Sequence, residues 1–192
     1  MRKLSALLLV SVAVLLSPAM ASAQAPKAPT EPPQPAPGMA DEVINSWNEV
    51  GRKLIAMAED FPEEKYDFKP SPEVRSFAEQ LLHIAGGNYL FLKAARGEKW
   101  SVADGSPPRE NYKTKADVVA FVKKSFADVV AYIREQGDAG MARPMKYPFD
   151  NRMIIQSAFW MDVASHPSEH YGQLVVYYRV NGMVPPASRP RR

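Results

Sequence analysis

The sequence predicts an all-α fold, an antiparallel four-helix bundle preceded by a signal peptide and a Pro-rich linker. Three observations lead to this prediction. Four segments repeat apolar residues at the three- and four-residue spacing of one helix face. No segment alternates convincingly between apolar and polar residues as a half-buried strand does. Proline and glycine clusters separate the four segments, and helices with one apolar face each bury those faces against one another.

The first helix is expected from Asp41 to Glu59. The second begins at Ser71-Pro72-Glu73, where proline suits the first turn of a helix. It continues to about Arg96, and Gly97 provides a C-terminal stop.

The third helix follows Thr114, whose side chain and that of Asp117 have the spacing of an N-terminal capping pair. The fourth runs roughly from Arg152 to Val180. Because proline lacks a backbone N–H and presses on the preceding turn, Pro167 predicts a kink there or a new turn at Ser165.

Residues 1–23 have the pattern of a secretory signal peptide. A basic pair precedes an apolar run from Leu4 to Leu16, and Ala21-Ser22-Ala23 supplies the small residues that signal peptidase accepts. The run is shorter than the ~20 residues of a membrane-spanning helix. We therefore expect cleavage before Gln24, no stable membrane insertion afterwards, and a periplasmic or secreted product. An uncleaved anchor is the alternative.

Residues 24–40 are expected to form a disordered linker and residues 41–188 the folded domain. Six prolines fall between Gln24 and Gly38, which favours a stiff, extended tether. The domain is large enough to bury a core without disulfides, and the chain has no cysteine. Residues 189–192 are expected to be a frayed basic tail.

The charge balance argues against nucleic acid as a partner. The formal net charge of +3 includes two basic residues of the predicted leader, and the basic tail is too short to form a binding patch. The partners that we expect are a small-molecule substrate of unknown identity and, as an option, a second copy of the chain in a homodimer.

The histidines carry the strongest functional signal. His166 and His170 stand four residues apart and share one face of the fourth helix, which makes them a chelating pair. Zinc and similar ions bind neutral imidazole, and three protein ligands with an open position are typical of a catalytic site. His83, in the second helix, is the only other histidine. The plainer interpretation, hydrogen-bonded histidines without an ion, stays open.

The segment from His166 to His170 also matches H-x-x-E-H, a protease motif in which Glu169 would be the general base. A motif this short also matches by chance, so we do not favour it.

Two carboxylates have the helical spacing to support the ligands. Glu79 lies four residues before His83, and Asp162 lies four residues before His166. Each could accept the second N–H of a ligand histidine and fix its tautomer. Solvated surface charge is the alternative for both.

The chain also resembles a known family. The block from His166 to Ser188, which contains H-P-S-E-H-Y-G and closes on V-P-P-A-S, resembles the C-terminal helix of the DinB-like superfamily, and Ser76 to Ile84 is similar to its second helix. The likeness covers about residues 41–188. It implies a four-helix bundle in which the three histidines hold one divalent metal ion, zinc, nickel or a related ion, with an open position.

Histidines and resemblance together favour a metal-dependent enzyme, of the hydrolase or thiol-dependent transferase type, whose ion lowers the pKa of a bound nucleophile. The alternatives are a non-catalytic metal-binding or structural bundle and an interaction module. These functions differ in one structural feature. An enzyme needs space and polar groups around the open coordination position, and a structural site does not.

Overall fold

The computed structural model describes residues 36–150 and 152–190, so the predicted signal peptide and most of the predicted linker lie outside the described residues. The helices are α1 (Met39–Asp60), α2 (Phe77–Ala95), α3 (Lys115–Met141), α4 (Gln156–Val163) and α5 (Ser165–Val180). Two strands, β1 (Pro144–Lys146) and β2 (Met153–Ile155), lie between α3 and α4. Short 3-10 turns occupy Glu63–Lys65, Val102–Gly105, Arg109–Asn111 and Pro186–Ser188. None of the described helices is both long and apolar enough to cross a membrane.

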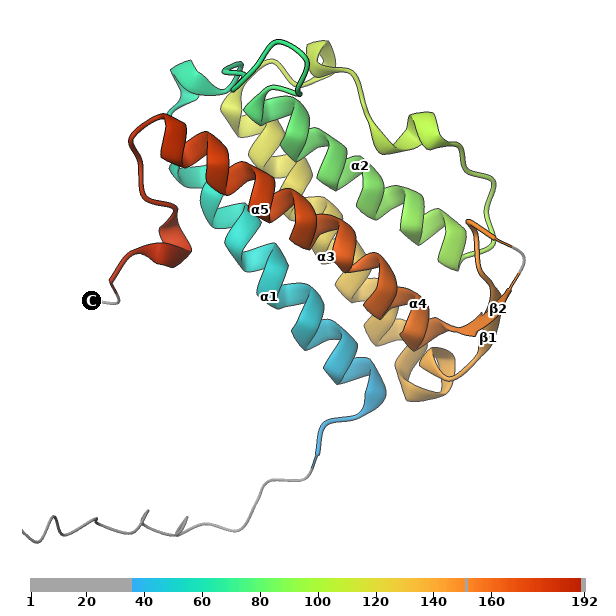
Figure 1. Cartoon of the computed structure of the whole chain (residues 1–192). Helices are drawn as coiled ribbons and strands as arrows, with labels where there is room; N and C mark the ends of the chain where they lie inside the picture. Colours follow the sequence, from blue (N-terminus) through green and yellow to red (C-terminus); the bar gives the residue numbers. More distant parts are fainter. Residues whose placement is uncertain (1–35, 151, 191–192) are drawn as a thin grey trace, which may run out of the picture. The chain divides into compact units, whose positions relative to one another are not determined.

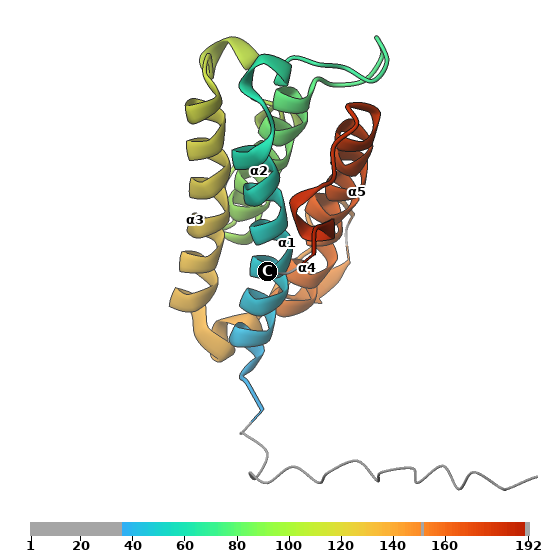
Figure 2. The same cartoon turned by 90° about the vertical axis from the view of Figure 1, so that its left-hand side faces the viewer.

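The predicted four-helix bundle is confirmed, with α4 and α5 together forming the fourth rod (Figure 1). α3 packs against α1 and α2, and α5 packs against the same two helices. Figure 2 shows α1 between α3 and α5. α2 and α3 run in the same direction because residues 97–113 carry the chain back along the bundle, while α1 and α5 run in the opposite direction (Figure 1).

The apolar stripes predicted from the sequence form the core. They are buried on α1 (Val43, Trp47, Val50, Leu54, Met57) and on α3 (Val118, Val122, Phe126, Val129, Ile133). Trp160 of α4 meets Trp47 edge to face, with ring centroids 5.6 Å apart. Burial of a large apolar side chain stabilises the fold by about 1.5–3 kcal/mol, so these stripes hold the bundle together.

The predicted start of α2 at Ser71 is wrong. The backbone N–H of Val74 bonds to the Ser71 carbonyl in a turn, and α2 begins only at Phe77. Ser76 caps the helix: its hydroxyl accepts from the Glu79 N–H at 3.2 Å, and the Glu79 carboxylate accepts from the Ser76 N–H at 2.6 Å. This reciprocal capping box satisfies the backbone N–H groups of Ser76 and Glu79, so the helix starts here.

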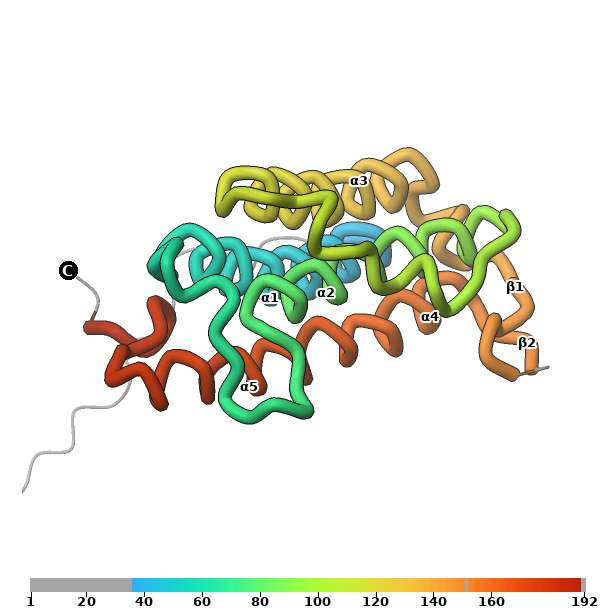
Figure 3. The backbone as a smooth tube through the Cα atoms, turned by 90° about the horizontal axis from the view of Figure 1, so that it is seen from above, coloured from blue at the N-terminus to red at the C-terminus, as the bar shows by residue number. Residues whose placement is uncertain are grey.

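The predicted fourth helix is shorter than expected and broken. Residues from Met153 to Ile155, expected in this helix, instead pair with Pro144 to Lys146 as an antiparallel hairpin. The hairpin lies at the end of the bundle where α4 begins (Figure 3). The predicted break near Ser165 is confirmed: α4 ends at Val163, one residue before α5, because Pro167 has no N–H to continue the ladder.

The C-terminal segment is not frayed at Arg189, contrary to expectation. Its guanidinium forms two hydrogen bonds with the Asp60 carboxylate, at 2.7 and 2.6 Å. This bidentate contact lowers the pKa of Asp60 and joins the segment after α5 to the end of α1. Residues 191–192 lie outside the described residues.

Candidate metal site

The three histidines converge on one point between α2 and α5. Nε2 of His166 lies 3.2 Å from Nε2 of His83 and 3.1 Å from Nε2 of His170. One ring nitrogen from each residue lies within 4.8 Å of the other two. The expectation that these side chains come together is confirmed.

This donor set fits a divalent ion. Three nitrogens that each lie ~2.1 Å from one ion at tetrahedral angles are ~3.4 Å apart. The separations of 3.2 and 3.1 Å from Nε2 of His166 to Nε2 of His83 and of His170 are close to this value. Neutral imidazoles are common ligands of zinc and nickel. The three side chains therefore match a site with three protein ligands and one open position.

The ring of His83 is oriented by the connection between α2 and α3. Its Nδ1 lies 2.9 Å from the Gly105 carbonyl oxygen and 2.9 Å from the Ser106 hydroxyl. Because a carbonyl oxygen only accepts, Nδ1 carries the proton and Nε2 presents a lone pair to the shared point.

The ring of His170 is oriented by two glutamines. Its Nδ1 lies 2.7 Å from Oε1 of Gln173 and 3.0 Å from Nε2 of Gln80, whose amide also donates to that same oxygen. Because Oε1 of Gln173 only accepts and its contact with Nδ1 is the shorter one, we place the ring proton on Nδ1. Gln80 is buried on α2, so this network also links α2 to α5. Nε2 of His170 is again left as the acceptor atom that faces the other two rings.

The ring of His166 depends on a glycine. A Cβ at Gly87 would lie 2.6 Å from Cε1 of His166, so only glycine lets the ring pass this close to α2. On the other side Phe91 meets the ring edge to face, with centroids 5.3 Å apart. Nδ1 of His166 is buried and has no hydrogen-bond partner among the described residues.

The histidines are held in the neutral form that a metal requires. Burial, the largest cause, lowers the pKa of His83 to about 4 and that of His166 to about 3, and it also lowers the pKa of His170. The positive charge of Arg75 lowers all three values further. At neutral pH no proton therefore competes with a cation for the Nε2 lone pairs.

The two carboxylates expected to accept hydrogen bonds from the ligand histidines have other partners. Glu79 caps α2 and forms an ion pair with Lys69 at 3.3 Å. Asp162 accepts a hydrogen bond from the Tyr147 hydroxyl. Neither has a hydrogen bond to a histidine among the described residues, and the supporting positions belong to Gly105, Ser106 and Gln173.

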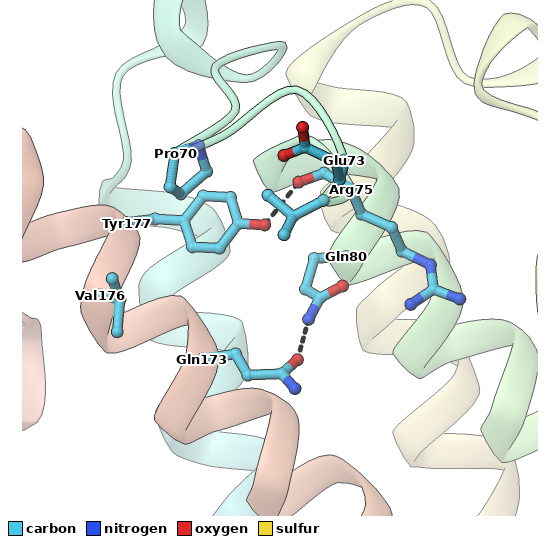
Figure 4. A pocket seen from close by; sticks show the side chains of 8 residues that line it. Pro70, Glu73, Arg75, Gln80, Gln173, Val176 and Tyr177 are labelled. Atoms are coloured by element: carbon cyan, nitrogen blue, oxygen red, sulfur yellow. Dashed lines mark hydrogen bonds between the residues drawn. The ribbon is translucent and has the colours of Figure 1, made fainter.

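Two cavities lie beside the three histidines. The histidine cavity has a volume of about 350 Å³ and is lined by His83, Gly87, Leu90, Phe91, Val102, Gly105, Tyr147, Phe149, Asp162, Val163, Ser165 and His166. The glutamine cavity, of about 630 Å³, is lined by Pro70, Glu73, Val74, Arg75, Gln80, Gln173, Val176 and Tyr177. Figure 4 shows Gln80 and Gln173 facing each other at one side of the glutamine cavity. Only the histidine cavity has two of the converging histidines in its wall.

Glu169, the general base of the protease-like motif, is exposed and belongs to neither cavity wall. The geometry therefore gives no support to the protease interpretation.

The fold and the site define a helical bundle in which three histidines from two facing helices can hold one divalent ion. The model of the DinB superfamily matches residues 46–174, and the chain belongs to that superfamily. None of the curated proteins compared with the chain matches it in sequence.

Solved structures share this fold at low sequence identity. A DinB-like protein from Bacillus cereus ATCC 10987 has a TM-score of 0.63 and 18% identity, with 76% of this chain and 95% of that chain covered. YfiT from Bacillus subtilis, described as a probable metal-dependent hydrolase with an unusual four-helix bundle topology, has a TM-score of 0.58 and 16% identity over 80% and 94% of the two chains. An uncharacterised protein from Escherichia coli UTI89 has a TM-score of 0.57 and 15% identity over 77% and 97%.

Proposed function

We propose that this protein is a metal-dependent hydrolase of a small molecule, with His83, His166 and His170 holding one divalent ion such as zinc or nickel. The observation that carries the proposal is the convergence of three Nε2 atoms at the wall of a cavity of about 350 Å³. A structural metal site is closed by four protein ligands, whereas three ligands beside a cavity leave room for a substrate. The description of YfiT as a probable metal-dependent hydrolase agrees with this choice.

A bound ion supplies a Lewis acid that polarises the bond to be cleaved. The residues of the chain position the rings and move the proton. The Gly105 carbonyl accepts a hydrogen bond from Nδ1–H of His83, and Oε1 of Gln173 accepts one from Nδ1–H of His170. These contacts fix both tautomers. Asp162 lines the same cavity as His83 and His166. We assign Asp162 the role of general base, which takes a proton from the attacking water and returns it to the leaving group.

Tyr147 positions that base. Its hydroxyl donates to the Asp162 carboxylate, and this hydrogen bond is the largest cause of the raised pKa of Tyr147. The tyrosine therefore remains a donor at neutral pH. It holds one carboxylate oxygen and leaves the other for the water.

The first test is elemental analysis of the protein purified without a metal-affinity tag. About one ion per chain is expected, and His170→Ala should contain none. Hydrolysis of a panel of aryl and alkyl esters and amides should then require the ion and be lost in Asp162→Asn. Full metal occupancy with no turnover of any ester or amide would reject the hydrolase. Transfer to an added thiol in its place would favour a thiol-dependent transferase.

We also propose that the chain is exported and cleaved before Gln24. The leader pattern of residues 1–23 supports this proposal, although those residues lie outside the described part of the chain. Intact-mass measurement of protein recovered from the periplasm and medium tests it. Exported protein that retains Met1 to Ala23 would indicate an uncleaved anchor.

A further inference from the structure

The histidine cavity has a strongly apolar wall next to the converging Nε2 atoms. His83 and His166 form one side, and the other side chains that enclose the space are largely apolar (Leu90, Phe91, Val102, Phe149, Val163). Besides the histidines, the polar side chains of the lining are Tyr147, Asp162 and Ser165. A charged substrate group placed against the apolar wall would lose its hydration without gaining a partner, so the wall selects a neutral group.

Aromatic rings continue from the histidines to the mouth of this cavity. Phe91 meets the His166 ring at 5.3 Å and an interplanar angle of 85°. Phe149 in turn meets Phe91 at 6.3 Å and 87°. Trp100 and Tyr147 each approach the Phe149 ring to 5.5 Å. Aromatic rings attract one another in edge-to-face pairs of this kind. An aromatic ring of a ligand in the cavity could therefore form a further edge-to-face pair with these side chains.

The mouth of the cavity is apolar on two sides. Phe149, between β1 and β2, is 50% exposed, and Val102, in the connection between α2 and α3, is 81% exposed. A single exposed apolar residue is ordinary on a protein surface. Here two such residues from separate segments flank one cavity whose wall is also apolar, and a bound apolar group would cover both.

We propose that the histidine cavity binds an aromatic ring of the substrate and presents the adjoining bond to the metal site. This assignment of a substrate class rests on the proposed function. A cavity of about 150 Å³ is enough for benzene, so about 350 Å³ holds a ring together with the atoms of an ester or amide link. Asp162 is the acidic residue that lines this cavity together with His83 and His166.

The test compares two metal-binding probes that differ only in the ring. Benzohydroxamate and acetohydroxamate are titrated into zinc-loaded protein by calorimetry. The ring should tighten binding about tenfold or more, because it covers apolar surface that the methyl group leaves exposed. Phe149→Ala should weaken benzohydroxamate about fivefold and leave acetohydroxamate unchanged. Val74→Ala, which removes an exposed apolar side chain from the glutamine cavity, is the matched control and should change neither affinity.

Equal affinities of wild-type protein for the two hydroxamates would overturn the proposal. A second measurement is independent of the metal and of turnover. Toluene added to chelator-treated, isotope-labelled protein should shift the amide signals of Gly87, Leu90 and Phe149. If these signals respond but no ion is found, the hydrolase fails while the ring-binding cavity stands. If toluene leaves these signals unmoved, the cavity does not bind a ring, whether or not the protein is a metalloenzyme.

Discussion

The α-carbon of Gly87 lies so close to the His166 ring that a single added methyl group would be 2.6 Å from Cε1. Real Cβ atoms do not make contacts this short, so the ring, the helix or both must move if the glycine is replaced. A feature of the α2 backbone therefore determines where a side chain of α5 can lie. The neighbouring Gly86 has the same role toward the Gly105 carbonyl, which a Cβ would approach to 2.8 Å.

Gly87→Ala should weaken metal binding about 10- to 100-fold, the range found when groups that orient a ligand are changed. Alanine is a better helix former than glycine by about 1 kcal/mol, which partly offsets the clash with the ring. The free energy of unfolding should therefore fall by less than the free energy of zinc binding. Gly172→Ala is the control, because an added Cβ there on α5 would meet no side chain and no other segment within 4 Å among the described residues, apart from its immediate chain neighbours. Isothermal titration with zinc and urea unfolding measure the two effects. Unchanged zinc affinity in Gly87→Ala would contradict the proposed position of His166 as a ligand.

His170→Ala should abolish stoichiometric metal binding while the helical content stays largely intact. The apolar stripes of the bundle bury enough surface to fold a domain of this size without an ion. Metal should still raise the melting temperature of the wild type, because it binds only the folded state. Circular dichroism of the wild type with and without chelator, beside the variant, provides the measurement. Collapse of the helical signal on chelation alone would make the site structural.

The metal-free protein should lose stability as the pH falls from about 6.5 toward 4. The histidine pKa values are lower in the folded state than the ordinary value of 6.5, with His83 at about 4 and His166 at about 3. The unfolded chain therefore takes up protons first, and the stabilisation that is complete above pH 6.5 disappears on acidification. Urea unfolding at pH 7.5 and pH 5 should show a smaller difference for His166→Gln than for the wild type. An equal difference would mean that His166 is not buried in a neutral form.

Arg75→Gln should tighten zinc binding at pH 7.5 by about two- to fivefold, because an exposed positive charge repels a divalent cation only modestly through solvent. Arg75 forms no ion pair with an acidic residue among those described, and its charge lowers the pKa of all three histidines. Removing it should raise those pKa values, which NMR titration of the ring protons can follow. Arg134→Gln, a change on the exposed face of α3, should alter neither quantity. Weaker zinc binding in Arg75→Gln would show that the arginine supports the site.

The sequence locates α1 by its apolar stripe alone, and α3 by an apolar stripe together with a local cap. Thr114 and Asp117 form the predicted capping box, with the Asp117 N–H donating to the Thr114 hydroxyl at 3.1 Å. Ser71 and Pro72 imitate a helix start, so the predicted α2 begins too early, whereas the residue that caps the helix is Ser76. The hairpin was missed because strands of three residues are too short to show alternation.

Helical spacing predicts that His166 and His170 share a helix face, whereas the prediction that His83 joins them rests on the resemblance to the DinB-like superfamily. Their supporting groups differ in how visible they are. Gln173 lies three residues after His170, so helical spacing could have identified it. Gly105 and Ser106 lie in an irregular connection more than 20 residues from His83 in sequence. No local pattern relates them, because the contact exists only after residues 97–113 fold back along the bundle.

The hydrogen bonds from His83 to Gly105 and Ser106 also restrict how this connection can change in length. Surface loops generally accept insertions at little cost, because closing a longer loop adds only a small entropy penalty. Added residues just before Gly105 would shift the carbonyl away from the imidazole and release the ring.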